Sequence, residues 1–292
     1  MMELRHLRYF VATAEAGTVS GAAARLHLTQ PGLSRQLRQL EKDLGVPLFD
    51  RSTSRLELST TGRALLPQAR DLLQRADALK VAASFHALGR LERLTIGAPT
   101  VTLTDVVAPF IATLAPDDPT TDVLGADGLT PAETLRLGAD LAIGTIPAPP
   151  PLHGTALAVL PVWAYVPAGH PWAGRDRIAL ADLLNEPLIL LPPAFTARQS
   201  WEAAVAGAPH QRIEAANGTV AQALAAAGRG IAIASDDPRY GLIPLAVETD
   251  GRLLSIRLRA VWDSRHAAAT TIEDFAARLG RFIRDRYDAP VT

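Results

Sequence analysis

The chain has 292 residues, of which 48% are hydrophobic, and this is enough for about two domains with sizeable cores. It contains no cysteine, which excludes disulfide frameworks, thiolate zinc sites and cysteine-based redox sensing. The formal net charge of -1 conceals an asymmetry, because residues 1–90 carry +5 and the remainder carries -6, so a polyanionic partner is expected for the first part alone.

Two short helices are predicted at the start of the chain. Apolar residues recur at helical spacing over residues 3–15, and Gly17 ends this helix. Thr18 can cap a second helix, which runs to about residue 27 and carries small apolar residues that allow close packing. We expect these two helices to pack against each other.

A third helix is predicted over residues 30–44. Thr29 is a natural N-cap, and Pro31 lies in the first turn, where its missing N–H leaves no hydrogen bond unmade. Four leucines fall within a narrow arc and predict a buried face: Leu33, Leu37, Leu40 and Leu44. The opposite face is polar and basic, with Ser34 at its flank: Pro31, Arg35, Arg38, Gln39 and Lys42.

A short hairpin and a long helix follow. Residues 52–54 favour a turn and the leucines after them alternate, which predicts a hairpin with Arg51 and Arg55 beside its tip. Ser59 can cap a helix over about residues 60–86. Its leucines recur every seven residues, at Leu65, Leu72 and Leu79. Such a stripe predicts a partner helix.

From residue 91 onward, short apolar strands alternate with helices, and a last amphipathic helix is expected over about residues 271–286. This alternation is typical of an α/β domain with a largely parallel sheet. The predicted fold class is therefore α/β overall, preceded by an all-α segment with a hairpin and a long linking helix.

Three helices followed by a hairpin are typical of a winged helix-turn-helix, whose third helix enters the major groove of DNA. An arginine there can donate two hydrogen bonds to guanine, and the positive charge adds salt-dependent backbone binding. A solvated helix surface is the alternative for any single basic run. The coincidence of caps, spacing and a basic hairpin favours DNA binding.

Residues 3–66, from ELRHLRYF to GRALL, resemble the N-terminal domain of LysR-type transcriptional regulators without an evident gap. The family pattern appears here as TQPGLS, residues 29–34, with Gly32 where the family usually has alanine or serine. The resemblance implies base and phosphate contacts by Gln30, Pro31, Ser34, Arg35 and Arg38, and wing contacts by Arg51 and Arg55.

A weaker resemblance covers the rest of the chain, including LGADLAIG and GHPWA. It implies an effector domain similar to type 2 periplasmic binding proteins, with two α/β lobes joined by two crossovers. The predicted domains are a winged helix-turn-helix over 1–59, a linker and dimerisation helix over 60–89, and an effector domain over 90–292. Within that domain, lobe I is predicted over 90–161 and 266–292, and lobe II over 162–265.

Ligands of open α/β sheets collect beyond the carboxyl ends of strands, where helix N-termini present free N–H groups. Four such ends predict the effector contacts: Thr100, Val101, Thr102, Thr145, Phe195, Thr196, Arg198, Gly218 and Thr219. Hydroxyl and N–H groups favour a small anionic or polar metabolite, and Arg198 could pair with a carboxylate. Helix capping is the alternative role for the threonines, and core packing is the alternative for Phe195.

The sequence predicts a regulator rather than an enzyme or a solute-binding protein. It lacks the G-x-S-x-G, H-E-x-x-H and P-loop motifs, and nothing in it proposes a metal site or a cofactor. It also shows no secretory segment and no apolar run near the ~18 residues of a membrane span, so we expect a cytoplasmic protein. The expected partners are a pseudo-palindromic double-stranded DNA operator, a small-molecule effector and further copies of the chain, in a homodimer or, as the resemblance implies, a homotetramer.

Overall fold

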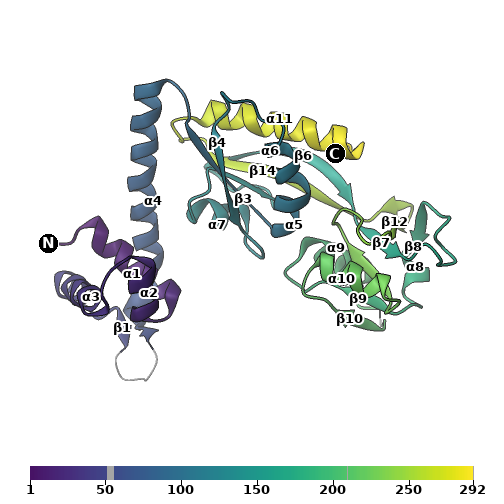
Figure 1. Cartoon of the computed structure of the whole chain (residues 1–292), viewed down its shortest axis with the longest axis horizontal. Helices are drawn as coiled ribbons and strands as arrows, with labels where there is room; N and C mark the ends of the chain where they lie inside the picture. Colours follow the sequence, from purple (N-terminus) through teal and green to yellow (C-terminus); the bar gives the residue numbers. More distant parts are fainter. Residues whose placement is uncertain (51–55, 209, 292) are drawn as a thin grey trace. The chain divides into compact units, whose positions relative to one another are not determined.

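The computed structural model describes residues 1–50, 56–208 and 210–291. The chain divides into two compact units, Met1–Gly89 and Arg90–Thr292 (Figure 1). Among the described residues, no helix is both long enough and apolar enough to cross a membrane.

The first unit consists of three short helices, a hairpin and one long helix. The helices are α1 (Leu4–Ala16), α2 (Val19–Arg25), α3 (Gln30–Leu44) and α4 (Thr60–Leu88), and the antiparallel strands are β1 (Phe49–Asp50) and β2 (Glu57–Leu58). The winged helix-turn-helix prediction is confirmed, and α3 begins and ends at the predicted residues. Arg51 and Arg55, predicted beside the tip of the hairpin, lie outside the described residues.

Local capping explains the bounds of α3. The Thr29 hydroxyl accepts a hydrogen bond from the Gly32 N–H at 3.2 Å, and Pro31 lies in the first turn. Gly45 ends the helix with a φ of 72°, a left-handed conformation that glycine adopts without steric cost. The predicted leucine face is buried in the core of the unit, where Phe10 and Phe49 meet edge to face.

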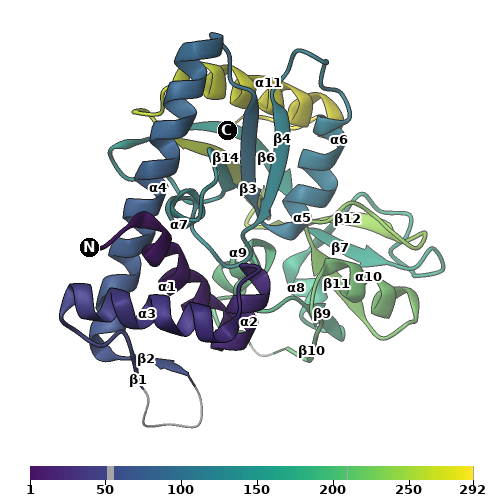
Figure 2. The same cartoon turned by 60° about the vertical axis from the view of Figure 1, so that its left-hand side comes forward.

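The helix α4 is only partly covered by its own unit. Its N-terminal part lies among the three short helices, and the rest extends beyond them (Figures 1 and 2). Leu65 packs against the core, whereas Leu72 is 44% exposed and Leu79 is 71% exposed. The first leucine of the heptad stripe therefore packs against the core of the unit, and the two later leucines are exposed on the surface of α4.

The second unit contains two β-sheets. The first has the order β4-β3-β5-β14-β6, in which β3, β4 and β5 are parallel. The second has the order β10-β9-β11-β7-β12-β13, with β8 paired to β12, and its strands β9, β10 and β11 are parallel. Two sheets, each with three adjacent parallel strands, agree with the predicted two-lobed α/β domain.

The bounds of these elements follow in chain order. The strands are β3 (Arg93–Ala98), β4 (Thr120–Gly125), β5 (Leu141–Gly144), β6 (Leu152–Pro161), β7 (Trp163–Val166), β8 (Arg177–Ala179), β9 (Leu188–Leu190), β10 (Arg212–Glu214), β11 (Ile231–Ala234), β12 (Ile243–Thr249), β13 (Arg252–Leu253) and β14 (Ser255–Asp263). The helices are α5 (Thr100–Thr102), the π-helix η1 (Leu103–Val107), α6 (Ala108–Ile111), α7 (Pro131–Arg136), α8 (Leu180–Leu183), α9 (Thr196–Val205), α10 (Gly218–Ala226) and α11 (Ala269–Tyr287).

The structure moves one predicted boundary. Residues 255–263 were predicted in lobe II, but they form β14, which pairs with β5 and β6 of the first sheet. Lobe I is therefore residues 90–161 and 255–291, and lobe II is residues 162–254. The physical reason is that an apolar strand has the same sequence pattern in either sheet, so that only the tertiary pairing decides which sheet it joins.

Candidate DNA-recognition face and effector site

The predicted recognition residues lie on the exposed side of α3. Gln30, Pro31, Arg35 and Arg38 are exposed, and Ser34 is half-buried. The Arg38 Nε donates a hydrogen bond to the Ser34 carbonyl oxygen at 3.2 Å, which directs this side chain along the helix. Arg35 forms no ion pair with any described residue, so its guanidinium is available to a phosphate or a base edge.

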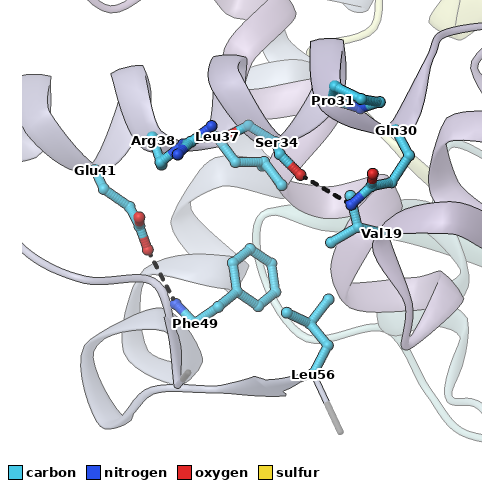
Figure 3. Close-up of a pocket in the computed structure, with 9 residues that line it drawn as sticks. All are labelled: Val19, Gln30, Pro31, Ser34, Leu37, Arg38, Glu41, Phe49 and Leu56. Carbon is cyan, nitrogen blue, oxygen red and sulfur yellow. Dashed lines mark hydrogen bonds between the residues drawn. The ribbon is translucent and has the colours of Figure 1, made fainter. Parts of the chain in front are cut away.

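A recess of about 460 Å³ opens between α3, α2 and the hairpin (Figure 3). Its polar residues come from α3, and its apolar residues come from all three elements: Val19, Gln30, Pro31, Ser34, Leu37, Arg38, Glu41, Phe49 and Leu56. Four of the predicted DNA contacts therefore line one recess. Arg35 does not line it.

Glu41 is a functional candidate that was not predicted from the sequence. It lies on α3 between basic residues, and its Oε1 accepts hydrogen bonds from the backbone N–H of Leu48 at 2.9 Å and of Phe49 at 3.3 Å (Figure 3). The sequence did contain a signal for this role, because an acidic residue is unfavourable on a helix that faces a polyanion. The carboxylate connects the recognition helix to the start of the hairpin.

In lobe I, a carboxylate of the chain itself occupies the helix start that we predicted to bind an anion. The Thr100 N–H donates to Asp127 Oδ1 at 2.9 Å, and the Thr100 hydroxyl donates to the same carboxylate. Val101 and Thr145 are half-buried, whereas Thr102 is only 6% exposed. An anionic ligand at Thr100 would therefore have to displace Asp127.

In lobe II, Arg198 is held within the lobe. It is 4% exposed, and it donates from Nε to Glu202 at 2.6 Å and from Nη1 to the Leu191 carbonyl oxygen at 3.1 Å. The guanidinium is thus already paired with a carboxylate four residues along α9. Its neighbours Phe195 and Thr196, at the start of the same helix, are half-buried and remain candidate contacts.

The start of α10 is covered by a second internal carboxylate. A Cβ on Gly218 would lie 2.0 Å from Asp236 Oδ2, so only glycine leaves room for this side chain, while Thr219 is exposed. Asp236 is 6% exposed, and burial together with the negative charge of Asp105 raises its pKa to about 6. The Tyr165 hydroxyl donates to the Asp236 carbonyl oxygen, and burial raises the pKa of Tyr165 as well.

An ion pair between a buried carboxylate and a partly exposed guanidinium joins the two lobes. Asp105, in the π-helix of lobe I, is 7% exposed and accepts from Arg239 Nη2 at 2.6 Å and from the Asp237 N–H at 2.9 Å, both in lobe II. The Tyr287 hydroxyl of α11 donates to the Asp105 carbonyl oxygen at 2.8 Å. Single π-helical turns occur often at functional sites. Here the π-helix contributes the carboxylate that connects the lobes.

The loops beyond the strands of the two lobes also meet. A Cβ on Gly128, which follows β4, would lie 3.6 Å from the Ala194 Cβ, which follows β9. Loops of the two lobes therefore approach one another beyond the carboxyl ends of β4 and β9, the end of the strands where ligands of such sheets bind. No group of His, Asp or Glu side chains among the described residues could hold a metal ion.

Comparison with known proteins identifies both units. The family model described as "Bacterial regulatory helix-turn-helix protein, lysR family" matches residues 4–63, and the model described as "LysR substrate binding domain" matches residues 89–283. The regulator TfdT of Cupriavidus pinatubonensis is 37% identical over 199 residues, which are 65% of this chain and 86% of TfdT. AlsR of Bacillus subtilis is 31% identical over 206 residues, which are 68% of this chain and 66% of AlsR.

Solved structures share the fold. A full-length OxyR variant from Pseudomonas aeruginosa is 24% identical and matches with a TM-score of 0.66, covering 97% of this chain and 95% of that one. Full-length CbnR in complex with its target DNA is also 24% identical with a TM-score of 0.66, covering 97% of this chain and 99% of that one. The matched family models span most of the sequence, and the chain therefore belongs to the LysR family of DNA-binding transcriptional regulators with an effector-binding domain.

Proposed function

We propose that two copies of the protein pair through α4 and read a pseudo-palindromic operator with the exposed face of α3. The observation that carries this proposal is the set of exposed polar and basic residues at the start of a helix whose other face is buried. Leu72 and Leu79 supply the apolar surface for pairing. Since members of this family form oligomers, we propose a homodimer that associates further into a homotetramer, acting in the cytoplasm where its operator lies.

The effector is proposed to bind between the lobes, at the carboxyl ends of their parallel strands. The candidate contacts are Thr100, Val101, Thr102, Thr145, Phe195, Thr196, Gly218 and Thr219. The ligand is a small polar or anionic metabolite, and it changes the protein only if it binds one arrangement of the lobes more tightly than another. The Asp105–Arg239 pair connects the lobes. A ligand that favours the lobe arrangement in which this pair is formed therefore stabilises the pair, and a ligand that favours another arrangement opposes it.

Replacing Arg35 by alanine should weaken operator binding by roughly fivefold to a hundredfold, which is the range for one arginine that contacts a guanine bidentately. The measurement is fluorescence anisotropy with an operator recovered from a random duplex library, at one fixed salt concentration because phosphate contacts depend on salt. Arg177→Ala is the matched control, since Arg177 is an exposed arginine of β8, outside the DNA-binding unit and α4, that pairs with Glu248. Equal losses in both variants, or no loss in Arg35→Ala, would contradict the placement of the recognition face.

Thr100→Val tests the effector site. The variant removes the hydroxyl that hydrogen-bonds Asp127, so a metabolite that binds here should show a dose response shifted by about fivefold, the scale of one hydrogen bond. The metabolite is first found by screening for compounds that change operator binding. Thr104→Val is the control, because Thr104 is an exposed threonine of the adjoining π-helix η1 whose hydroxyl donates to the Thr100 carbonyl oxygen. Operator binding without the metabolite should be unchanged, and an unshifted dose response would remove Thr100 from the site.

A further inference from the structure

A segment of three residues that follows α3, Pro47 to Phe49, connects the recognition helix to the rest of the first unit. On the side of α3, Glu41 Oε1 accepts the N–H groups of Leu48 at 2.9 Å and Phe49 at 3.3 Å. Hydrogen bonds to a charged acceptor are about twice as strong as neutral ones. This carboxylate therefore fixes Leu48 and Phe49 to the recognition helix, and Figure 3 shows its bond to Phe49.

On the side of α4, the same three residues are held by the helix start. The Ser59 N–H donates to the Leu48 carbonyl oxygen at 2.9 Å, and the Ser59 hydroxyl donates to the Pro47 carbonyl oxygen at 2.6 Å. Ser59 also caps α4, because its Oγ accepts from the Gly62 N–H at 2.9 Å. Residues 47–49 are thus bonded at once to the recognition helix and to the first turn of the linker helix.

Gly62 shows how closely α4 approaches this segment. A Cβ at this position would lie 2.0 Å from the Leu48 carbonyl oxygen, and Gly62 itself is buried. A glycine within a helix costs about 1 kcal/mol relative to alanine, so space rather than helix propensity explains the residue. Leu48 is fully buried and Ser59 is 7% exposed, so water does not compete for these hydrogen bonds.

We propose that residues 47–49 form a joint that sets the angle between the linker helix α4 and the recognition helix α3, with Glu41 and Gly62 as its positioning residues. This inference rests on the proposed dimer. When two α4 helices pair, the joint then determines how far apart the two recognition helices lie and how each enters its groove. Half-site spacing on the operator is a direct readout of that geometry, because each dimer fits one separation of half-sites.

The experiment compares spacing profiles. The operator that the wild-type protein selects from a random duplex library is remade with one or two base pairs added to or removed from its centre, and affinities are measured for each duplex and for a single half-site. For the wild type we expect affinity to fall when the spacing changes. In Glu41→Ala and Gly62→Ala, the ratio of affinities for the selected and altered spacings should fall by roughly fivefold to tenfold, the scale of one intramolecular hydrogen bond.

Two further variants distinguish a joint from ordinary support of the fold. Glu41→Gln keeps an oxygen that can accept the two N–H groups, so it should retain the wild-type profile. Glu57→Ala removes an exposed carboxylate from the hairpin and should change affinity equally at every spacing. If Gly62→Ala does not fold, Glu41→Ala still gives the result.

Three outcomes overturn the proposal. Proportional losses in Glu41→Ala at every spacing and on the half-site would show that Glu41 only supports the recognition helix. If both Glu41→Ala and Gly62→Ala keep the wild-type spacing profile, the proposal of the joint is wrong, whereas the proposal of a dimeric operator still holds. If the affinity of the wild-type protein does not depend on half-site spacing, the proposal of a dimeric operator is wrong and the proposal of the joint is wrong with it.

Discussion

Arg239→Ala should destabilise the second unit by about 2 to 3 kcal/mol. Its guanidinium is 26% exposed and pairs with the buried Asp105 carboxylate, whose other hydrogen-bond donor in lobe II is the Asp237 N–H. Breaking a buried pair is costly because the remaining charge stays desolvated, and partial exposure of Arg239 places the effect at the lower end. All four tryptophans lie in the second unit, so urea unfolding followed by tryptophan fluorescence reports on that unit.

Arg252→Ala is the control for this prediction, because Arg252 is an exposed arginine on β13 of the same lobe. Its removal should change the free energy of unfolding by less than about 0.5 kcal/mol. The double variant Asp105→Ala/Arg239→Ala should lose less than the sum of the two single variants, since the pair is coupled. Strict additivity would mean that the two side chains do not stabilise the lobe connection through each other.

Asp236→Asn should abolish a loss of stability that the wild-type second unit suffers as pH rises from about 4 to 6. The pKa of Asp236 is raised from 3.8 to about 6, so between these values the folded state holds a proton that the unfolded state has released. Folding is therefore favoured at low pH, and the advantage disappears as pH rises through the folded pKa. A shift of this size corresponds to about 3 kcal/mol. The facing groups are Asp105, Asp237 and Arg239.

The measurement is urea unfolding at several pH values between 4 and 8, again by tryptophan fluorescence. Asp274→Asn, an exposed change on α11, should follow the wild-type pH dependence. Asp118 acts in a lower window: its hydrogen bonds from Arg278 lower its pKa to about 2, so its contribution is lost only as pH falls below about 4. Equal pH dependence in the wild type and Asp236→Asn would show that Asp236 is not the titrating group.

Local features of the sequence were sufficient to predict the helices of the first unit. The bounds of α3 follow from Thr29, Pro31 and Gly45, and its buried and exposed faces follow from periodicity, because caps and helical spacing depend on residues within a few positions of each other. The Arg198–Glu202 pair is equally local, since the two residues lie four positions apart on one helix, although Arg198 was predicted to contact the effector. The DNA contacts on α3 remain predictions.

Contacts between residues far apart in the sequence determined the ion pairs and the strand pairing of the second unit. Asp127 caps Thr100 across 27 residues, and Arg239 meets Asp105 across 134, distances in sequence over which no periodicity carries information. The same holds for β14, whose apolar pattern suits either sheet. The sequence by itself determined the recognition helix, the linker helix and the α/β class, because these depend on local hydrogen bonds and hydrophobic spacing. Only the tertiary structure decided which carboxylates fill the helix starts and join the lobes, because a charge finds its partner through folding of the whole domain.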